Sequence, residues 1–163
     1  MTAHSAGAPR SKTEQSRLED GLRDMFQSRI AFNRTLGLHV LSFDPRKPAM
    51  GFDMSPALVG NYHAGRLHGG VISAVLDTTA GFGLMCAIGE RFADESSTKI
   101  LARFQRIGTI DLRVDYLRPG IGSSFIATAT ISRLGGRVGS TQMALHNDQG
   151  LLIATGAGAY VVS

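Results

Sequence analysis

One acidic residue, Asp77, stands alone in an otherwise apolar stretch from Gly70 to Ile88. An ionised carboxylate in apolar surroundings is costly unless it is hydrogen-bonded or used in chemistry. Such a group can be a base that activates water, or a nucleophile that attacks a carbonyl carbon. The alternative is a structural acid that caps loop amides or lies exposed at a subunit edge. Asp77 is therefore the first candidate catalytic residue.

Two glycines, Gly69 and Gly70, follow His68 at the start of the same stretch. Consecutive glycines let the backbone come close to a ligand, and the first N–H groups of a helix are unpaired at its positive end. This turn could therefore form an oxyanion hole. It could also serve only as a tight entry to the helix.

The spacing between turn and acid limits how they can work together. Seven residues separate Gly70 from Asp77, so the two share a helix face but lie roughly 10 Å apart along its axis. One carbonyl group cannot contact both within a single chain. Two such helices paired antiparallel about a two-fold axis would bring the turn of one subunit to the acid of the other. The sequence thus predicts a homodimer with composite sites, and a homotetramer as a dimer of dimers.

Other polar residues near the turn have weaker claims to chemistry. His68 is more typical of an orienting hydrogen-bond partner than of a base. Asn61 could position a water or a substrate oxygen, although an Asn after a Gly is first of all a turn residue. His63 and His68 are five residues apart without a third ligand nearby, so we expect no metal site.

The elements that must hold these residues can be read from the hydrophobic pattern. Residues 1–13 are polar and small and are expected to form a disordered tail, followed by a single domain over residues 14–163. Apolar residues spaced three and four apart predict an amphipathic helix over Glu14–Phe32. A β-hairpin is expected over 36–43 and 49–54, with a loop from Gly60 to Leu67.

The second half of the chain alternates between polar and apolar residues as strands do. The run Gly70–Ile88 predicts a helix enclosed by other structure, and a polar connector of about twenty residues follows over 89–108. Strands are expected over residues 109–117, 123–133, 138–146 and 151–162, arranged as an antiparallel meander. The fold class is therefore α+β, with an antiparallel sheet of about six strands wrapped around a central buried helix.

Composition narrows the class of protein further. A length of 163 residues with 43% hydrophobic content suits one domain, and a lone cysteine, Cys86, is interpreted as core packing. Gly69–Gly89 is long enough to cross a bilayer, but it carries Asp77 near its centre and is better explained as a core helix. The N-terminal residues lack an apolar signal stretch, so we expect a cytoplasmic location and no membrane span.

Basic residues gather between residues 99 and 137, where seven stand against two acidic residues. They are dispersed and lack the interleaved aromatic residues of a base-stacking surface, so we expect no nucleic-acid partner. A solvated face and a binding surface for a phosphate-bearing small ligand are the two remaining interpretations.

Two segments resemble the PaaI-like acyl-CoA thioesterases of the hot-dog superfamily. The first is Asn61–Asp77, with the His-Gly-Gly to Asp spacing of that family, and the second is Thr109–Pro119, which is similar to its strand after the helix. The resemblance covers about residues 36–162. It implies that Asp77 is the catalytic acid and that Gly69, with Gly70, is the oxyanion donor. By the same resemblance, Asn61 and His68 help at the thioester end and Thr109 assists the water.

The resemblance also implies a substrate and a reaction. Family members bind coenzyme A with the acyl chain between subunits and the phosphates outside, so Arg118, Arg133 and Arg137 become candidates for phosphate binding. The expected reaction is hydrolysis of an acyl-CoA with a medium, long or aryl acyl group, without a metal or redox cofactor. An enoyl-thioester hydratase and a non-catalytic module that binds acyl-CoA are the alternatives.

Overall fold

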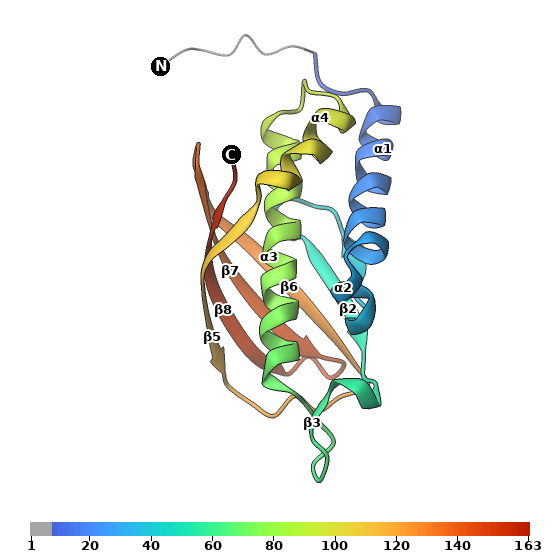
Figure 1. Cartoon of the computed structure of the whole chain (residues 1–163), viewed down its shortest axis with the longest axis vertical. Coiled ribbons are helices and arrows are strands. Elements are labelled where there is room, and N and C mark those ends of the chain that lie inside the picture. Colours follow the sequence, from blue (N-terminus) through green and yellow to red (C-terminus); the bar gives the residue numbers. More distant parts are fainter. Residues whose placement is uncertain (1–7) are drawn as a thin grey trace.

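One long helix, α3 (Gly69–Arg91), runs through the middle of the molecule (Figure 1). A computed structural model describes residues 8–163, so the first seven residues of the expected tail lie outside the described residues. Nearly all of α3 between Thr79 and Gly89 is buried. By length and composition α3 could span a membrane, but most of it is enclosed by this domain. The expectation of a central helix over Gly70–Ile88 is confirmed, although its first two turns are only partly buried.

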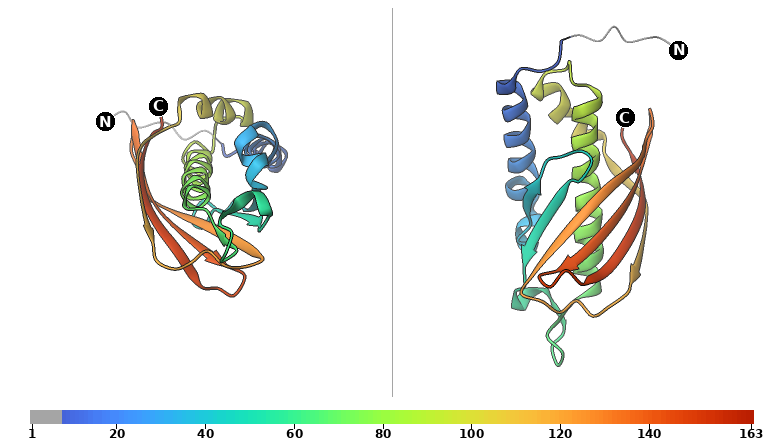
Figure 2. Two further views of the ribbon diagram at one scale, coloured as in Figure 1. Left: turned by 60° about the horizontal axis from the view of Figure 1, so that its bottom comes forward. Right: turned by 180° about the vertical axis from the view of Figure 1, so that it is seen from behind.

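Six antiparallel strands form one sheet that curves around α3 (Figure 2). Alternate side chains of the long strands point at the helix and are buried, as in β7. This is the hot-dog arrangement that the family resemblance implies. The strands are β1 (His39–Ser42), β2 (Ala49–Asp53), β5 (Gly108–Tyr116), β6 (Ser124–Leu134), β7 (Val138–Asn147) and β8 (Leu152–Val161).

The strand order corrects the expected four-stranded meander. The order is β1-β2-β6-β7-β8-β5, so β5 pairs with β8 at the edge, and β6 pairs with β2. The chain between β5 and β6 passes across the end of the sheet below α3 (Figure 1). Residues 117–123 can do this because three strand spacings of about 4.8 Å are within reach of seven extended residues.

The N-terminal segment covers the side of α3 that the sheet leaves open (Figure 2). It forms α1 (Lys12–Arg23), a π-helical turn (Asp24–Arg29) and α2 (Ala31–Leu36), in place of the single helix expected over Glu14–Phe32. The helix breaks at Ile30, which is extended. The buried Asn33 side chain donates to the carbonyl of Phe26 (2.9 Å) and so satisfies a group at the break.

The connector expected over residues 89–108 is largely helical, which corrects its interpretation as a polar linker. Helix α3 continues to Arg91, and α4 (Ser97–Ala102) and a 3₁₀ turn (Arg103–Arg106) follow it. Ser96 caps α4, and Ile100 is fully buried. The segment therefore packs as part of the core against α1 and α3.

Charged residues near the N-terminus fasten this end of the molecule. The Arg10 guanidinium donates to the carbonyls of Phe92 (2.7 Å) and Glu95 (3.0 Å), and to that of Gly89. The Glu14 carboxylate accepts from the backbone N–H (3.0 Å) and hydroxyl (2.9 Å) of Ser97. Residues 10–13 thus belong to the folded part, and the tail boundary expected at residue 13 is too far along the chain.

A small second sheet precedes α3, where the sequence indicates a loop. A 3₁₀ turn (Pro56–Leu58) leads into β3 (Val59–Asn61), which pairs with β4 (Arg66–Leu67). This hairpin projects beyond the end of the main sheet (Figure 1). Its tip carries Tyr62, whose side chain is exposed.

Candidate active site

Asp77 lies two turns into α3, half-buried, and two hydroxyl groups hold its carboxylate. The Thr109 hydroxyl donates to Asp77 Oδ1 (2.9 Å), and the Tyr160 hydroxyl donates to the same oxygen (3.0 Å). Within residues 8–163, no donor lies within hydrogen-bonding distance of Oδ2. One oxygen of the carboxylate is thus anchored, and the other is open to a ligand.

The two hydroxyl groups come from neighbouring strands that are in register. Thr109 on β5 lies opposite Tyr160 on β8, and both side chains reach α3. The register shifts between Thr109 and Asp111, so Ile110 has no partner. This β-bulge changes the alternation of the strand, because Leu112 and Val114 also pack on the core while Ile110 is 55% exposed.

The bulge corrects the face expected for Ile110. Strict alternation would place Ile110 on the inner face with Leu112 and turn Thr109 outward. The extra residue reverses this order, so Thr109 faces α3 at the level of Asp77. The bulge thus delivers the hydroxyl that contacts the acid.

Tyr160 is a site residue that sequence reasoning missed. Its side chain is 1% exposed, and burial raises the pKa of its hydroxyl far above the usual range, with the Asp77 charge acting in the same direction. The phenol therefore stays protonated and serves as a permanent donor. A tyrosine in an apolar strand is typical of a core residue, and only its need for a buried partner could have pointed to Asp77.

At the start of α3, His68 is the N-cap residue. Its Nδ1 accepts from the Gly70 N–H (2.9 Å), which requires the neutral tautomer with the proton on Nε2. This contact agrees with an orienting role for His68. It also occupies the N–H of Gly70, so that group is not free to act as the oxyanion donor expected of it.

The Gly69 N–H is the open donor at this turn. Among residues 8–163, no acceptor lies within hydrogen-bonding distance of it. The Gly69 carbonyl accepts from the Tyr116 hydroxyl (3.0 Å), which fixes the first peptide of the helix to the end of β5. Tyr116 is thus a second residue whose contact with the site no local sequence pattern indicates.

Asn61 holds the projecting hairpin. Its side-chain oxygen accepts from the Ala64 N–H (3.2 Å), as expected of a turn residue. No hydrogen bond joins Asn61 to His68, Gly69 or Asp77 within the described chain. A role in holding water or the thioester remains a prediction for this residue.

The structure thus gathers the expected site residues into two groups. Asp77 and Thr109 meet, with Tyr160 added, while His68, Gly69 and Gly70 lie together at the helix start. Eight residues of helix separate Gly69 from Asp77, an axial distance of roughly 12 Å. The two groups do not face one reacting atom within one chain.

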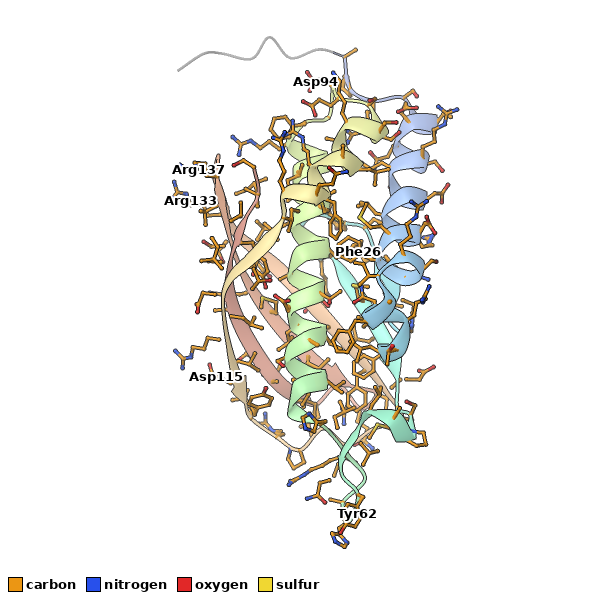
Figure 3. The ribbon with its side chains drawn as sticks, viewed as in Figure 1. Phe26, Tyr62, Asp94, Asp115, Arg133 and Arg137 are labelled. Carbon is orange, nitrogen blue, oxygen red and sulfur yellow. The ribbon has the colours of Figure 1, made fainter. Side chains whose placement is uncertain are left out.

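The three candidate arginines lie at opposite ends of the molecule. Arg133 and Arg137 lie near one another at the β6–β7 end (Figure 3). Arg91 of α3 donates to the carbonyls of Leu134 and Gly135 in the same turn. Arg118 follows β5 near the start of α3 and donates to the Leu152 carbonyl (3.0 Å). The single chain therefore does not form one cluster from all three.

Neither metal-ligand nor thiol chemistry is indicated by the described residues. Over residues 8–163, no three His, Cys, Asp or Glu side chains gather as metal ligands would. Cys86 is buried, and burial raises the pKa of its thiol to about 12. A thiol that stays protonated is a poor nucleophile, which agrees with a core-packing role.

Comparison with known families decides the identity of the fold. Residues 64–154, which include Gly69, Asp77 and Thr109, match the model of the thioesterase superfamily. The chain belongs to the thioesterase superfamily. An open backbone N–H can stabilise an oxyanion, and an open carboxylate oxygen can act as a base or a nucleophile.

Relatives of this thioesterase extend the match over most of the chain. It is 40% identical over 139 residues to the medium/long-chain acyl-CoA thioesterase YigI of Salmonella typhimurium, covering 85% of this chain and 90% of the relative. The YigI protein of Escherichia coli K12 is 39% identical over the same coverage. A crystal structure of a Shewanella oneidensis protein related to the thioesterase superfamily superposes with a TM-score of 0.87. It shares 36% identity, covering 94% of this chain and 100% of that one.

Proposed function

We propose that this protein hydrolyses acyl-CoA thioesters with medium or long acyl chains, or aryl groups, to the free acid and coenzyme A. The observation that carries the proposal is the Asp77 carboxylate, held at Oδ1 by Thr109 and Tyr160 with Oδ2 open. The two YigI relatives, named for medium/long-chain acyl-CoA, support the substrate class.

The proposed chemistry uses only groups of the protein and water. The Gly69 N–H stabilises the oxyanion that develops on the thioester carbonyl. Oδ2 of Asp77 either removes a proton from the attacking water or attacks the carbonyl carbon and is later released by water. In both routes the C–S bond breaks and the thiolate of coenzyme A takes up a proton. No metal or redox cofactor takes part.

A homodimer is part of the proposal, because the two half-sites lie apart in one chain. Strand β5 supports it: its outer edge has no neighbour within the described chain, and most of its residues are exposed. Long open edges in natural proteins are usually paired or covered. The lower half of α3 is also only partly buried, with Gly70 exposed. A two-fold pair would bring Gly69 of one protomer to Asp77 of its partner, and a tetramer would join two such dimers.

Phosphate binding by arginines completes the proposed substrate site. Arg91, Arg133 and Arg137 lie at the C-terminal end of α3 or in the adjoining turn, fourteen helical residues beyond Asp77 and so roughly 20 Å along its axis. We place the phosphates of coenzyme A there; Arg118, at the opposite end of the chain, could contribute only from the partner protomer. A cytoplasmic location is proposed as well.

The test is a thiol-release assay with purified protein and a panel of acyl-CoAs of increasing chain length, including aryl groups. Asp77→Asn keeps an oxygen that can accept from Thr109 and Tyr160 but removes the charge. We expect its kcat to fall about 10³-fold, with Tm unchanged. Asp94→Asn, at an exposed loop acid (Figure 3), is the control and should match the unaltered protein.

The same panel separates the alternatives. Thiol release that survives Asp77→Asn would contradict the assigned acid. Acyl-CoA binding without release would favour a binding module, and hydration of an enoyl-CoA would favour a hydratase. An active monomer in sedimentation would contradict the composite site.

A further inference from the structure

The buried hydroxyl of Tyr160 contacts the one acid of the proposed site, and among residues 8–163 it makes no other hydrogen bond. The ring is 1% exposed, and its hydroxyl lies 3.0 Å from Asp77 Oδ1. A buried phenol needs a hydrogen-bond partner, but a phenylalanine at this position would pack without needing one. The contact therefore points to a role for the hydroxyl itself.

We infer that Tyr160 is a positioning residue, which turns the Asp77 carboxylate so that Oδ2 is the oxygen presented to water and substrate. The inference rests on the proposed thioester hydrolysis. Two donors on Oδ1 leave that oxygen poorly available for chemistry. They also restrict rotation of the carboxylate about its last side-chain bond.

The two donors differ in how firmly they are themselves held. Thr109 is exposed and lies beside a bulge, near the edge of the sheet. Tyr160 is enclosed in the core on β8, between β7 and β5. A donor fixed by core packing defines a direction more tightly than one on an exposed strand. Tyr160 is therefore the main anchor, and Thr109 is the adjustable second donor.

The glycine at position 158 leaves room for the Tyr160 ring. A Cβ atom at Gly158 would lie 2.8 Å from Cε2 and 2.9 Å from the hydroxyl oxygen of Tyr160. Any side chain at position 158 would thus displace the ring. Gly158 pairs with Thr141 on β7, a buried residue whose hydroxyl donates to the Gly158 carbonyl (3.5 Å). The absence of a side chain at 158 leaves the space that the ring occupies beneath Asp77.

Two variants test the inference in different ways. Tyr160→Phe removes the donor and keeps the ring, whereas Gly158→Ala keeps the donor and displaces it. Because a small misplacement of a reacting group can cost about 100-fold in rate, we expect kcat to fall about 10- to 100-fold in both. KM should stay within about threefold, because neither change alters the groups proposed to bind coenzyme A.

A matched control removes the effect of lost stability. Ile153→Val alters a fully buried side chain on the same strand, away from Asp77, and should lower Tm slightly while leaving kcat unchanged. Thr109→Val, combined with Tyr160→Phe, supplies a readout that a purely structural role would not move. With both donors gone the carboxylate can rotate, so the double variant should lose more than the product of the single losses.

The outcomes are separable. If the unaltered protein releases no thiol from any acyl-CoA, the proposed function fails. If it is active and Tyr160→Phe retains its kcat, the inference about Tyr160 fails alone. A loss in Tyr160→Phe that is the same with and without Thr109, or that a variant of equal Tm reproduces, would also overturn it.

Discussion

The two ends of α3 differ in how many of their polar groups have hydrogen-bond partners within the chain. At the C-terminal end, Arg10 donates to carbonyls of residues 89, 92 and 95, and Glu14 accepts from the start of α4. At the N-terminal end, the Gly69 N–H and Asp77 Oδ2 have no partner among residues 8–163. Both residues are partly exposed, so these groups are free to bind water or a ligand. The polar groups at the C-terminal end of α3 are thus paired within the chain, and the proposed chemistry lies at the other end.

The largest expected effect is on activity, and it tests whether the site at the N-terminal end of α3 is shared between two protomers. Gly69→Pro removes the N–H donor, and proline is tolerated at the first position of a helix when the preceding residue is extended, as His68 is. Gly69→Pro and Asp77→Asn should each be nearly inactive. After unfolding and refolding together in equal amounts, they should recover about one quarter of the original activity, because half of the dimers gain one intact composite site.

Gly69→Ala, which keeps the N–H, is the matched control for the proline variant and should retain most of the activity. Separate refolding of each variant measures the baseline. If the mixture stays as inactive as its components, each site lies within one chain, and the division of α3 into two half-sites is wrong.

A smaller effect is expected at the closed end. Arg10→Ala leaves carbonyls at the end of α3 without their charged donor, and we expect a loss of about 2–3 kcal/mol in the free energy of unfolding. Urea denaturation measures this loss. The kcat, measured at a temperature well below Tm, should stay within twofold of that of the unaltered protein. Arg29→Ala, which removes an exposed ion pair with Asp24, should cost far less. A fall in kcat comparable to that of Asp77→Asn would break the contrast between the two ends.

The smallest effect is a pH dependence at Glu14. The hydrogen bond from the Ser97 backbone, with those from Arg17 and the Ser97 hydroxyl, lowers the pKa of Glu14 to about 2. A lowered pKa in the folded state stabilises the protein above the ordinary pKa of 4.5, and this contribution is lost as the pH falls from there towards 2. The Tm difference between the unaltered protein and Glu14→Gln should therefore be constant near neutral pH and shrink below about pH 4.5.

Glu90→Gln, at an exposed acid of α3, is the control for this titration and should show no such window. A Tm difference for Glu14→Gln that grows as the pH falls would mean that Glu14 does not fasten α4 in the way the hydrogen bonds indicate.

Periodic patterns explain why most elements could be predicted from the sequence. Strands β5 to β8 begin and end within about one residue of their expected bounds, because alternating side chains mark the strand length directly. Helix α3 was recognisable from its apolar run. Asp77 and the Gly69 turn stood out because a lone acid and paired glycines are unusual in such a run.

The remaining features depend on tertiary contacts that no local pattern encodes. The position of β5 beside β8 is set by a crossing connection, not by alternation along either strand. The break at Ile30 is supported by the Asn33 side chain, and α4 is fastened by Glu14 from far away in sequence. The contact between Tyr160 and Asp77 joins residues 83 positions apart. The hydrogen bond from the Gly70 N–H to His68 Nδ1 depends on a side-chain rotamer that the sequence does not specify.

The unpaired residue in β5, Ile110, lies between two parts of the strand that have different roles. After it, Leu112 and Val114 pack against the hydrophobic core. Before it, Thr109 donates a hydrogen bond to Asp77. If the same residues ran as a regular strand without the bulge, Ile110 would face α3 and Thr109 would face outward, so an aliphatic side chain would replace the hydroxyl opposite Asp77. The bulge at one residue therefore decides which side chain of β5 meets the acid, while the pairing of the rest of β5 with β8 follows regular alternation.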